Sequence, residues 1–332
     1  MSIARSISHL LGATAAVVFI AGCGSAFQTN QQTSSPVQTS RLKTWISPSA
    51  KDAPVLFFQG DVNLGNIYIF SLPDMTLKGT ITGLSEPLGM CSDLAGNIYV
   101  AESGKSRVDE FTRTGTQIAT YTDTYGYPSA CAVNPQNGYL AVTDNSSPLK
   151  ILVFSSPSSP PTVLTVPHMT YLSYAGYNNK GELWVDGSNY LEFALSRCNA
   201  STCKPLNVQG AQDFEAGTVQ WDDVRKTWVI FDEACDNQNP GSCSYPVSEQ
   251  GALGQQTSYN NYKRAAVCSL KQAVIGAYEK RFVVGGDWDY DTCGGPTGNA
   301  VYRWAYPAGG NPTNHAALPN GARPYGAAIS TK

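Results

Sequence analysis

The sequence predicts an all-β fold that is built from six repeated units. A short apolar strand that ends in an acidic residue recurs at 55–61, 98–102, 139–144, 183–186, 228–232 and 282–287. The first residues of these copies lie 43, 41, 44, 45 and 54 positions apart. A period of about 40–50 residues is typical of radial arrays, in which each unit buries its apolar face only against its neighbours. Six copies therefore predict a six-bladed β-propeller with four antiparallel strands in each blade.

The first 22 residues have the composition of an export signal. Arg5 supplies a positive charge, residues 10–20 are apolar, and the segment ends in Ile20-Ala-Gly-Cys23. This ending resembles the lipobox of bacterial lipoproteins, which implies cleavage before Cys23 and attachment of fatty acids such as palmitate through its thiol. The resemblance predicts a chain that is anchored in the bacterial cell envelope, and Gly24 in place of an aspartate favours the outer membrane. The alternative is an ordinary secretory signal followed by a cysteine that carries no lipid.

Residues 23–50 are predicted to form the lipidated cysteine and a flexible tether. Ser, Thr, Gln, Asn and Pro dominate this segment, and such a composition buries too little apolar surface to offset the entropy of ordering. Trp45 and Ile46 could attach the end of the tether to the body. The propeller is expected over residues 51–332, a length that all-β domains commonly reach as one unit.

The composition, with few charged and many turn-forming residues, indicates the class of protein. Charged residues make up 14% of the chain, against a typical share of about a quarter. The formal net charge is −3 at pH 7 and no basic run appears, so nucleic acid is not expected as a partner. We expect an exported, turn-rich β protein whose partner is an envelope protein, a peptide or a carbohydrate.

The cysteines predict disulfides. Nine cysteines include Cys23, which leaves eight, an even number, in a chain that is expected to be exported. Their positions along the repeats suggest the pairs Cys198–Cys203, Cys235–Cys243, Cys91–Cys131 and Cys268–Cys293, although the sequence does not fix the connectivity. A metal cluster is the alternative, but no two cysteines form a tight C-x₂-C pair and only two histidines follow Cys23.

The second blade resembles an NHL repeat. It contains Pro-Leu-Gly at 87–89, Gly-Asn-Ile-Tyr-Val-Ala-Glu at 96–102 and Arg-Val-Asp-Glu-Phe at 107–111. The family pattern has a proline-glycine phrase in the inner strand, "G-N-I-Y-V-A-D" in the second and "R-I-x-x-F" in the third. The resemblance is close over residues 85–155 and covers the rest of the body in outline. It implies the propeller fold and says little about function.

The two ends of the repeated region indicate how the ring closes. Residues 324–329 repeat the inner-strand phrase of 87–91 and 128–133, yet no second strand follows them. The first blade, which starts at Val55, has no such phrase before it. The C-terminal strand is therefore expected to join the first blade as its inner strand, which leaves the ring without free edges.

One face of the propeller is predicted to carry the functional residues. The turns after the second strands and the links between blades share this face, around the mouth of the channel. The acidic residues expected there are Asp61, Glu102, Asp144, Asp186, Asp232 and Asp287. The segments that lead into the inner strands add Glu86, Tyr127, Tyr174, Glu215 and Tyr325. These side chains suit a cation, a sugar or a peptide; alternatively, the acids cap hairpin turns and the tyrosines pack between blades.

The function expected from these features is a non-catalytic scaffold that binds a ligand or a protein through this rim and needs no cofactor. The alternative is a metal-dependent hydrolase of the gluconolactonase type, another propeller family, in which Glu86, Glu215 and Asp144 would hold one divalent cation, Ca²⁺ or Mg²⁺/Mn²⁺. Residues 215–221 faintly resemble that family's glutamate motif, but the proline that normally follows the glycine is missing. A third possibility is a purely structural envelope protein whose channel is filled by side chains.

Overall fold

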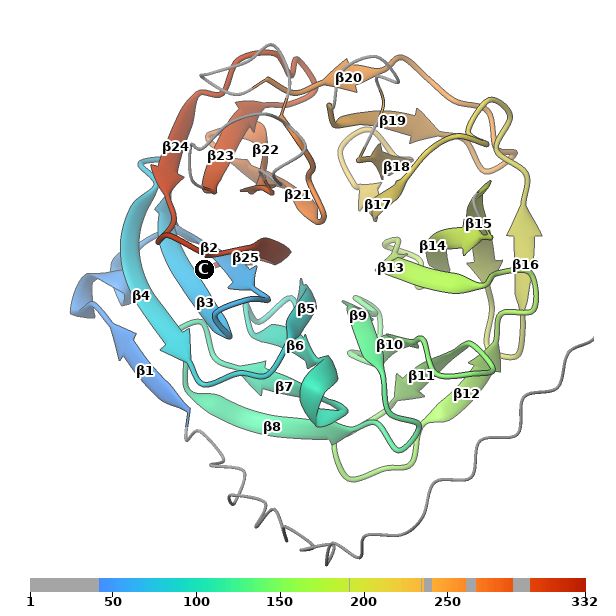
Figure 1. The fold of residues 1–332 in the computed structure, drawn as a ribbon, viewed down its shortest axis with the longest axis horizontal. Coiled ribbons are helices and arrows are strands. Elements are labelled where there is room, and N and C mark those ends of the chain that lie inside the picture. The colour runs from blue at the N-terminus through green and yellow to red at the C-terminus, as the bar shows by residue number, and fades with distance from the viewer. Residues whose placement is uncertain (1–41, 191, 234, 236–240, 261–266, 289–298) are drawn as a thin grey trace, which may run out of the picture. The chain divides into compact units, whose positions relative to one another are not determined.

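Six antiparallel sheets stand side by side around one axis (Figure 1). The computed structural model describes residues 42–332 except 191, 234, 236–240, 261–266 and 289–298. The chain divides into two units, Met1–Thr39 and Ser40–Lys332, and the sheets belong to the second. The predicted six-bladed propeller is confirmed. The predicted signal segment and Cys23 lie outside the described residues, and none of the helices described could span a membrane.

Blades two to six each consist of four consecutive strands, ordered from the axis outward. Blade two contains β5 (Pro87–Ser92), β6 (Ile98–Glu102), β7 (Arg107–Phe111) and β8 (Gln117–Thr122). Blade three contains β9 (Pro128–Val133), β10 (Leu140–Asp144), β11 (Lys150–Phe154) and β12 (Thr162–Thr165). Blade four contains β13 (Tyr171–Tyr177), β14 (Leu183–Asn189), β15 (Glu192–Cys198) and β16 (Cys203–Leu206). Blade five contains β17 (Ala216–Asp222), β18 (Thr227–Asp232), β19 (Cys243–Val247) and β20 (Thr257–Ser258). Blade six contains β21 (Ala273–Tyr278), β22 (Lys280–Asp287), β23 (Ala300–Ala305) and β24 (Asn314–Ala317).

Blade one joins the two ends of the propeller, as predicted. It combines β2 (Val55–Asp61), β3 (Asn66–Leu72) and β4 (Thr76–Thr82) with the C-terminal strand β25 (Pro324–Thr331). β25 lies antiparallel to β2 as the inner strand, and the register pairs Val55 with Thr331 and Phe57 with Ile329. The backbone hydrogen bonds of this pair close the ring.

A fifth strand extends blade one into the predicted tether. β1 (Lys43–Ile46) pairs antiparallel with the outer edge of β4, and a 3₁₀ helix (Pro48–Asp52) follows it. Ala50 is fully buried, and Leu42 and Ile46 pack against the core of the blade. The end of the segment 23–50 is therefore ordered. The composition did not reveal this strand, because an edge strand of four residues is held mainly by backbone hydrogen bonds.

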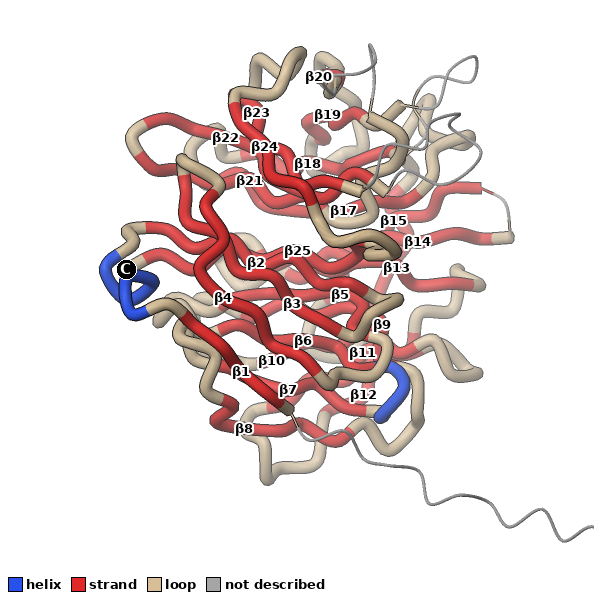
Figure 2. The backbone as a smooth tube through the Cα atoms, turned by 60° about the vertical axis from the view of Figure 1, so that its left-hand side comes forward, coloured by secondary structure: helices blue, strands red, loops and turns tan. Residues whose placement is uncertain are grey.

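The strands run between two faces of the ring (Figure 2). The upper face is the face that carries the turns between second and third strands and the links between blades. The lower face carries the turns between first and second strands and between third and fourth strands. Figure 1 looks at the upper face, where the short helix Ser103–Lys105 follows β6.

The core lies between the blades, because each strand sends alternate side chains to the two neighbouring blades. In β6, Ile98 and Val100 pack with residues of blade one, whereas Tyr99 and Ala101 pack with residues of blade three. Between blades four and five, Trp184 and Trp228 stack with ring centroids 4.5 Å apart. Second strands are covered on both sides, which explains their continuous apolar sequences.

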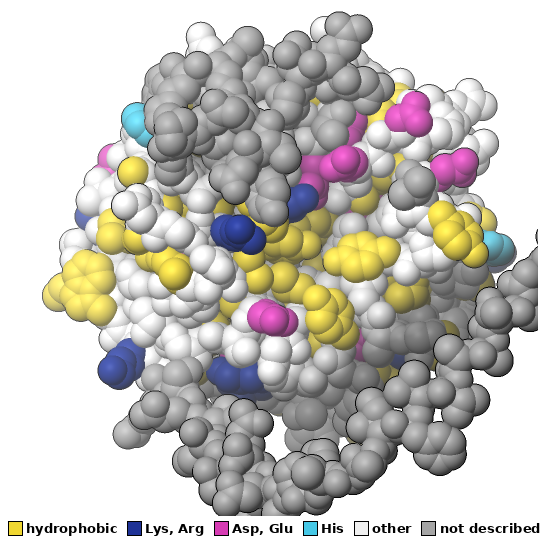
Figure 3. Space-filling view, in the orientation of Figure 1, with side chains coloured by type: hydrophobic (Ala, Val, Ile, Leu, Met, Phe, Trp, Pro, Cys, Tyr) yellow, Lys and Arg dark blue, Asp and Glu magenta, His cyan; other side chains and the backbone are white. Residues whose placement is uncertain are grey.

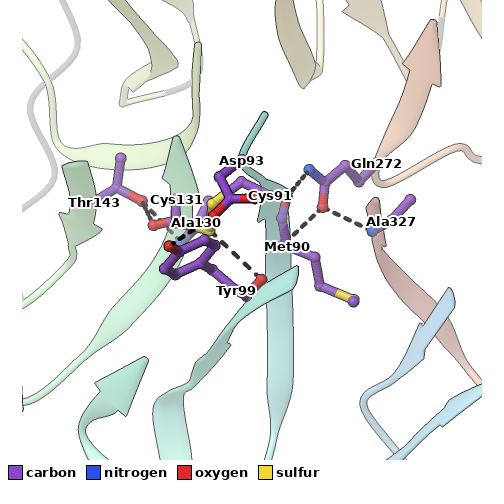
Figure 4. The surroundings of a disulfide bond; sticks show 9 residues. All are labelled: Met90, Cys91, Asp93, Tyr99, Ala130, Cys131, Thr143, Gln272 and Ala327. Carbon is purple, nitrogen blue, oxygen red and sulfur yellow. Dashed lines mark hydrogen bonds between the residues drawn. A yellow bond between two sulfur atoms is a disulfide. The ribbon is translucent and has the colours of Figure 1, made fainter. Parts of the chain in front are cut away.

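Three of the four predicted disulfides are present among the described residues. Cys91 on β5 and Cys131 on β9 join the inner strands of blades two and three, with Cα atoms 5.6 Å apart (Figure 4). Cys198–Cys203 and Cys235–Cys243 close local loops in blades four and five. Cys268 is also disulfide-bonded, and its predicted partner, Cys293, lies outside the described residues.

Candidate functional site

The six acidic residues predicted for the rim are buried, with exposed fractions of 0–3%. Each accepts a backbone N–H from the inner strand of its own blade or from the segment that leads into that strand. The pairs are Asp61 with Arg323, Glu102 with Ser85, Asp144 with Tyr127, Asp186 with Tyr174, Asp232 with Glu215, and Asp287 with Cys268. Their N···O distances are 2.7–3.3 Å. A buried carboxylate is stabilised by such bonds, so these acids fasten the inner strand to the second strand.

Glu102 belongs to a larger charged network in blade two. Its carboxylate pairs with Lys105 at 2.8 Å and with Arg107 at 2.9 Å, and Arg107 also binds Asp109 at 2.7 Å. Burial, together with the neighbouring Glu102, raises the pKa of Asp109 to about 7. The network is complete within the blade, which indicates a structural role.

Asp186 differs from the other five acids. Its Oδ1 accepts the Tyr174 N–H at 2.7 Å, while its Oδ2 has no hydrogen-bond partner among the described residues. Burial raises the pKa of Asp186 well above its usual value. The Tyr174 hydroxyl is also buried without a partner in the described part of the chain.

The remaining predicted residues divide into exposed and enclosed groups. Glu86, Tyr127 and Glu215 are exposed on the upper face. Tyr174 is 2% exposed and Tyr325 is half-buried, and their rings lie 6.4 Å apart beside the axis. The structure therefore brings together only Tyr174 and Tyr325 of this group.

Three residues that the sequence did not single out complete a cluster at the upper mouth of the channel. Lys271 forms an ion pair with Glu233 and lies 5.2 Å from the centroid of the Trp288 ring. Trp288 packs on Tyr325, with centroids 6.0 Å apart. We call Tyr174, Glu233, Lys271, Trp288 and Tyr325 the axial cluster. Its members come from blades four, five and six and from the closing strand, so no local motif marks them.

Glu233 is the titratable centre of the axial cluster. Its side chain is buried, and Ser269 donates a hydrogen bond to its Oε2 at 3.1 Å. Burial raises the pKa of Glu233 to about 7, although the charge of Lys271 opposes this shift. The carboxyl therefore changes its charge near neutral pH at the centre of the upper face.

Exposed tyrosines lie on the same face as the axial cluster. Tyr125 and Tyr127 lie between β8 and β9, Tyr171 begins β13, and Tyr190 lies in the turn after β14. Their exposed fractions are 47, 41, 39 and 80%. Figure 3 shows this face, with apolar and aromatic side chains around its centre and charged side chains of both signs beside them. The upper face thus offers a mixed aromatic and charged surface.

The metal-dependent alternative needs three or four converging oxygen ligands. In the part of the chain that the structure describes, no group of three His, Cys, Asp or Glu side chains could hold a metal ion. Glu86 and Glu215 are exposed, whereas Asp144 is buried, accepts the Ser146 N–H at 2.7 Å and lies 3.6 Å from the Lys150 ammonium. The three predicted ligands are not brought together, and the described residues do not fit the cation.

The channel contains a cavity that opens on the lower face. About 190 Å³ of space lies between the inner strands, lined by residues that include Met90, Thr218 and Gln272. It adjoins a hollow of about 550 Å³, and the two share Tyr177 and Gln220. A purely structural role would suggest a channel filled by side chains, and the described channel is not filled in this way. The hollow lies on the face opposite the predicted rim.

Comparison with known proteins tests the resemblance to NHL repeats. No family model matches the chain. NHL-repeat-containing protein 4 of Mus musculus is 31% identical to it over 104 residues, which cover 30% of this chain and 73% of that protein. This chain belongs to the NHL-repeat family. The resemblance expected from the second blade is thereby confirmed.

Solved structures resemble this NHL propeller in fold alone. A crystal structure of a nidogen/laminin complex matches with a TM-score of 0.64 at 12% identity, covering 83% of this chain and 98% of that one. A Bacteroides caccae protein of unknown function matches with a TM-score of 0.60 at 12% identity, and the match covers 84% of this chain and all of that one. Hydrazine synthase of Kuenenia stuttgartiensis matches with a TM-score of 0.51 at 15% identity, and the match covers 72% of this chain and 67% of that one.

Proposed function

We propose that this NHL propeller is a recognition scaffold of the bacterial cell envelope that binds a polypeptide partner at its upper face. A lipid on Cys23 holds the chain at the membrane, with the outer membrane as the favoured location. The six buried carboxylates serve the fold, so the proposal assigns no catalytic residue and no cofactor.

One observation carries the proposal: exposed tyrosines gather on the face that carries the axial cluster. Four of the six most exposed aromatic side chains among the described residues lie there, namely Tyr125, Tyr127, Tyr171 and Tyr190. Tyr, Trp and Arg are enriched in protein interfaces, because they combine a large, rigid contact area with a polar end. Arg323 adds a guanidinium 5.8 Å from the centroid of the Trp288 ring. Both charge signs at the centre favour a polypeptide over a uniformly charged ligand.

Photo-crosslinking in cells tests the binding face. A photoreactive residue replaces Tyr190, which is 80% exposed on the upper face, or Val224, which is 67% exposed in the lower turn between β17 and β18. We expect a discrete adduct of higher mass from position 190 and none from position 224. The same adducts at both positions, or none at position 190, would contradict the proposal.

Labelling with palmitate tests the anchor. The full chain should incorporate labelled palmitate and sediment with the outer-membrane fraction, because several acyl chains anchor a protein stably. Cys23→Ala should remove the label and release the chain from that fraction. Label and sedimentation that survive this substitution would contradict the lipid anchor and leave the binding face untouched.

A further inference from the structure

A pocket of about 280 Å³ lies between blades three and four and opens on the lower face. The turn between β9 and β10 supplies Asn134, Asn137 and Tyr139. The turn after β15 supplies Asn199, and Tyr177 ends β13. The pocket is thus built from turns of two adjacent blades, on the face opposite the axial cluster.

Three asparagines of this pocket are held by their own turns. In each, the side-chain carbonyl oxygen accepts a backbone N–H two residues further along the chain. The bonds are Gln136 N to Asn134 Oδ1 at 2.9 Å, Tyr139 N to Asn137 Oδ1 at 3.0 Å and Ser201 N to Asn199 Oδ1 at 2.9 Å. No described residue accepts a hydrogen bond from any of the three Nδ2 groups. Because the oxygens are occupied, each amide is fixed and its NH₂ group remains available to a ligand.

The other lining residues are aromatic, apolar or neutral. Tyr139 is 40% exposed, and burial raises the pKa of Tyr177 to about 12, so its hydroxyl stays protonated. Leu164 and Leu183 supply an apolar floor, and none of the lining residues is charged. Gly181 has a positive φ, and a Cβ atom there would meet the Asn134 amide at 3.1 Å, so glycine allows this turn to lie close to Asn134. Apolar walls with a few oriented polar groups are typical of small-ligand sites.

A second cavity of about 420 Å³ continues the pocket along the surface. The two share Gly181, Asn199 and the residues on either side of Asn199. Arg197 lines the second cavity and pairs with Glu182 at 2.7 Å. Lys204 also lines it and is exposed, with no ion-pair partner in the described part of the chain. A ligand longer than one ring would therefore reach a cation.

We propose that these two cavities bind an oligosaccharide. One neutral ring lies against Tyr139, and its oxygens accept from the three asparagine NH₂ groups, while a carboxylate on the neighbouring ring pairs with Lys204. A purely apolar ligand would leave the three donors desolvated and unpaired, which costs free energy. A small anion would find no cation in the first pocket. This site goes beyond the proposed function and does not depend on it.

Calorimetric titration of the full-length chain, in a detergent without a sugar headgroup, tests the proposal. The probes are tetrasaccharides of glucose and of N-acetylglucosamine, tetragalacturonate, and the methyl ester of tetragalacturonate. We expect at least one to bind with a Kd of about 1 mM or below, and the acid to bind more tightly than its ester. Lys204→Ala should remove that preference for the acid. Failure of all four probes, or a preference that survives Lys204→Ala, overturns the proposal.

Matched variants locate the site. Asn137→Ala and Tyr139→Ala change exposed side chains, so the melting temperature should stay constant while binding weakens about tenfold. Tyr190→Ala, an exposed tyrosine on the upper face, should leave saccharide binding unchanged. Binding that survives both pocket variants, or that is lost with Tyr190→Ala, contradicts the site. The crosslink at position 190 reports on the upper face independently, so the two proposals can fail separately.

Discussion

Gln272, in the segment before β21, binds both backbone groups of Met90 on β5 (Figure 4). Its Nε2 donates to the Met90 carbonyl at 2.7 Å, and its Oε1 accepts the Met90 N–H at 2.9 Å. The same Oε1 accepts the Ala327 N–H of β25, also at 2.9 Å. One side chain of blade six thus joins the inner strands of blades one and two, whose channel-facing edges have no strand partner.

Replacing this side chain should destabilise the ring. Gln272→Ala leaves three backbone groups without their partner, and water in the axial cavity replaces those bonds only in part. We expect a loss of about 2 kcal/mol in the free energy of unfolding, measured with urea. Gln136→Ala is the control, because that exposed amide makes one surface bond, to Asn179. Equal effects of the two variants would refute a special role for Gln272.

The disulfide between blades should contribute more than the local one. Cys91 and Cys131 are 40 residues apart, whereas Cys198 and Cys203 are five apart. Because a cross-link restricts the unfolded chain more when its loop is longer, we expect losses of about 4 and about 2 kcal/mol for the respective double Cys→Ser variants. Thermal melts of the oxidised protein measure the difference. The reverse order would show that native-state effects outweigh loop entropy.

Stability should fall as the pH rises toward neutrality. The pKa of Glu233 is about 7 in the folded protein, against 4.5 for an ordinary glutamate. As the pH rises above 4.5, the unfolded chain loses this proton before the folded chain does, so the free energy of unfolding decreases until about pH 7. Glu233→Gln should reduce this decrease by roughly 3 kcal/mol. Urea unfolding at pH 4.5, 6 and 7.5 measures it, and parallel pH profiles of the two proteins would contradict the assignment.

Asp61 should behave as a structural residue. Its Oδ1 accepts the N–H groups of Asn63, Leu64 and Arg323 at 2.9–3.1 Å. Asp61→Ala removes the acceptor for three N–H groups, and we expect a loss of about 2–4 kcal/mol in urea unfolding. If the Asp61→Ala protein were stable but bound its partner more weakly, the result would instead support the predicted acidic binding rim.

Asp186 provides the matched contrast. Asp186→Asn keeps an oxygen for the Tyr174 N–H and removes a buried carboxyl whose second oxygen has no partner among the described residues. The free energy of unfolding at pH 7 should therefore change by less than about 1 kcal/mol. A larger loss would mean that this carboxyl serves a group that the described contacts do not include.

The repeat pattern predicted most of the fold because it reports burial directly. The second strands are covered on both sides, so their apolar runs and the regular spacing identify six blades. The unmatched inner-strand phrase at 324–329 predicted the closing strand, and the positions of Cys91 and Cys131 in successive blades predicted their pairing. β1 carries only the short apolar pair Trp45-Ile46, which indicated an attachment to the body but not a strand.

The candidate site was predicted less well, for a physical reason. An acid at the end of a strand fits an exposed turn as well as a buried carboxylate that accepts N–H bonds, and the sequence does not distinguish these environments. Glu233 follows Asp232 directly, and Lys271 precedes an inner strand, yet only the ring brings them beside Trp288. The lower pocket depends on how three asparagine side chains are oriented. The turns fix these orientations, and they cannot be read from the sequence.

Affinity for the partner captured at position 190 tests the central claim most directly. The purified partner is titrated against the wild-type chain, the double variant Tyr127→Ala/Tyr190→Ala and the lower-face variant Val224→Ala. Both tyrosines are exposed, by 41 and 80%, so the fold should be unaffected. A loss of about tenfold or more in the double variant alone is the predicted result. An unchanged affinity in the double variant, or a loss with Val224→Ala, would contradict the upper face as the recognition surface.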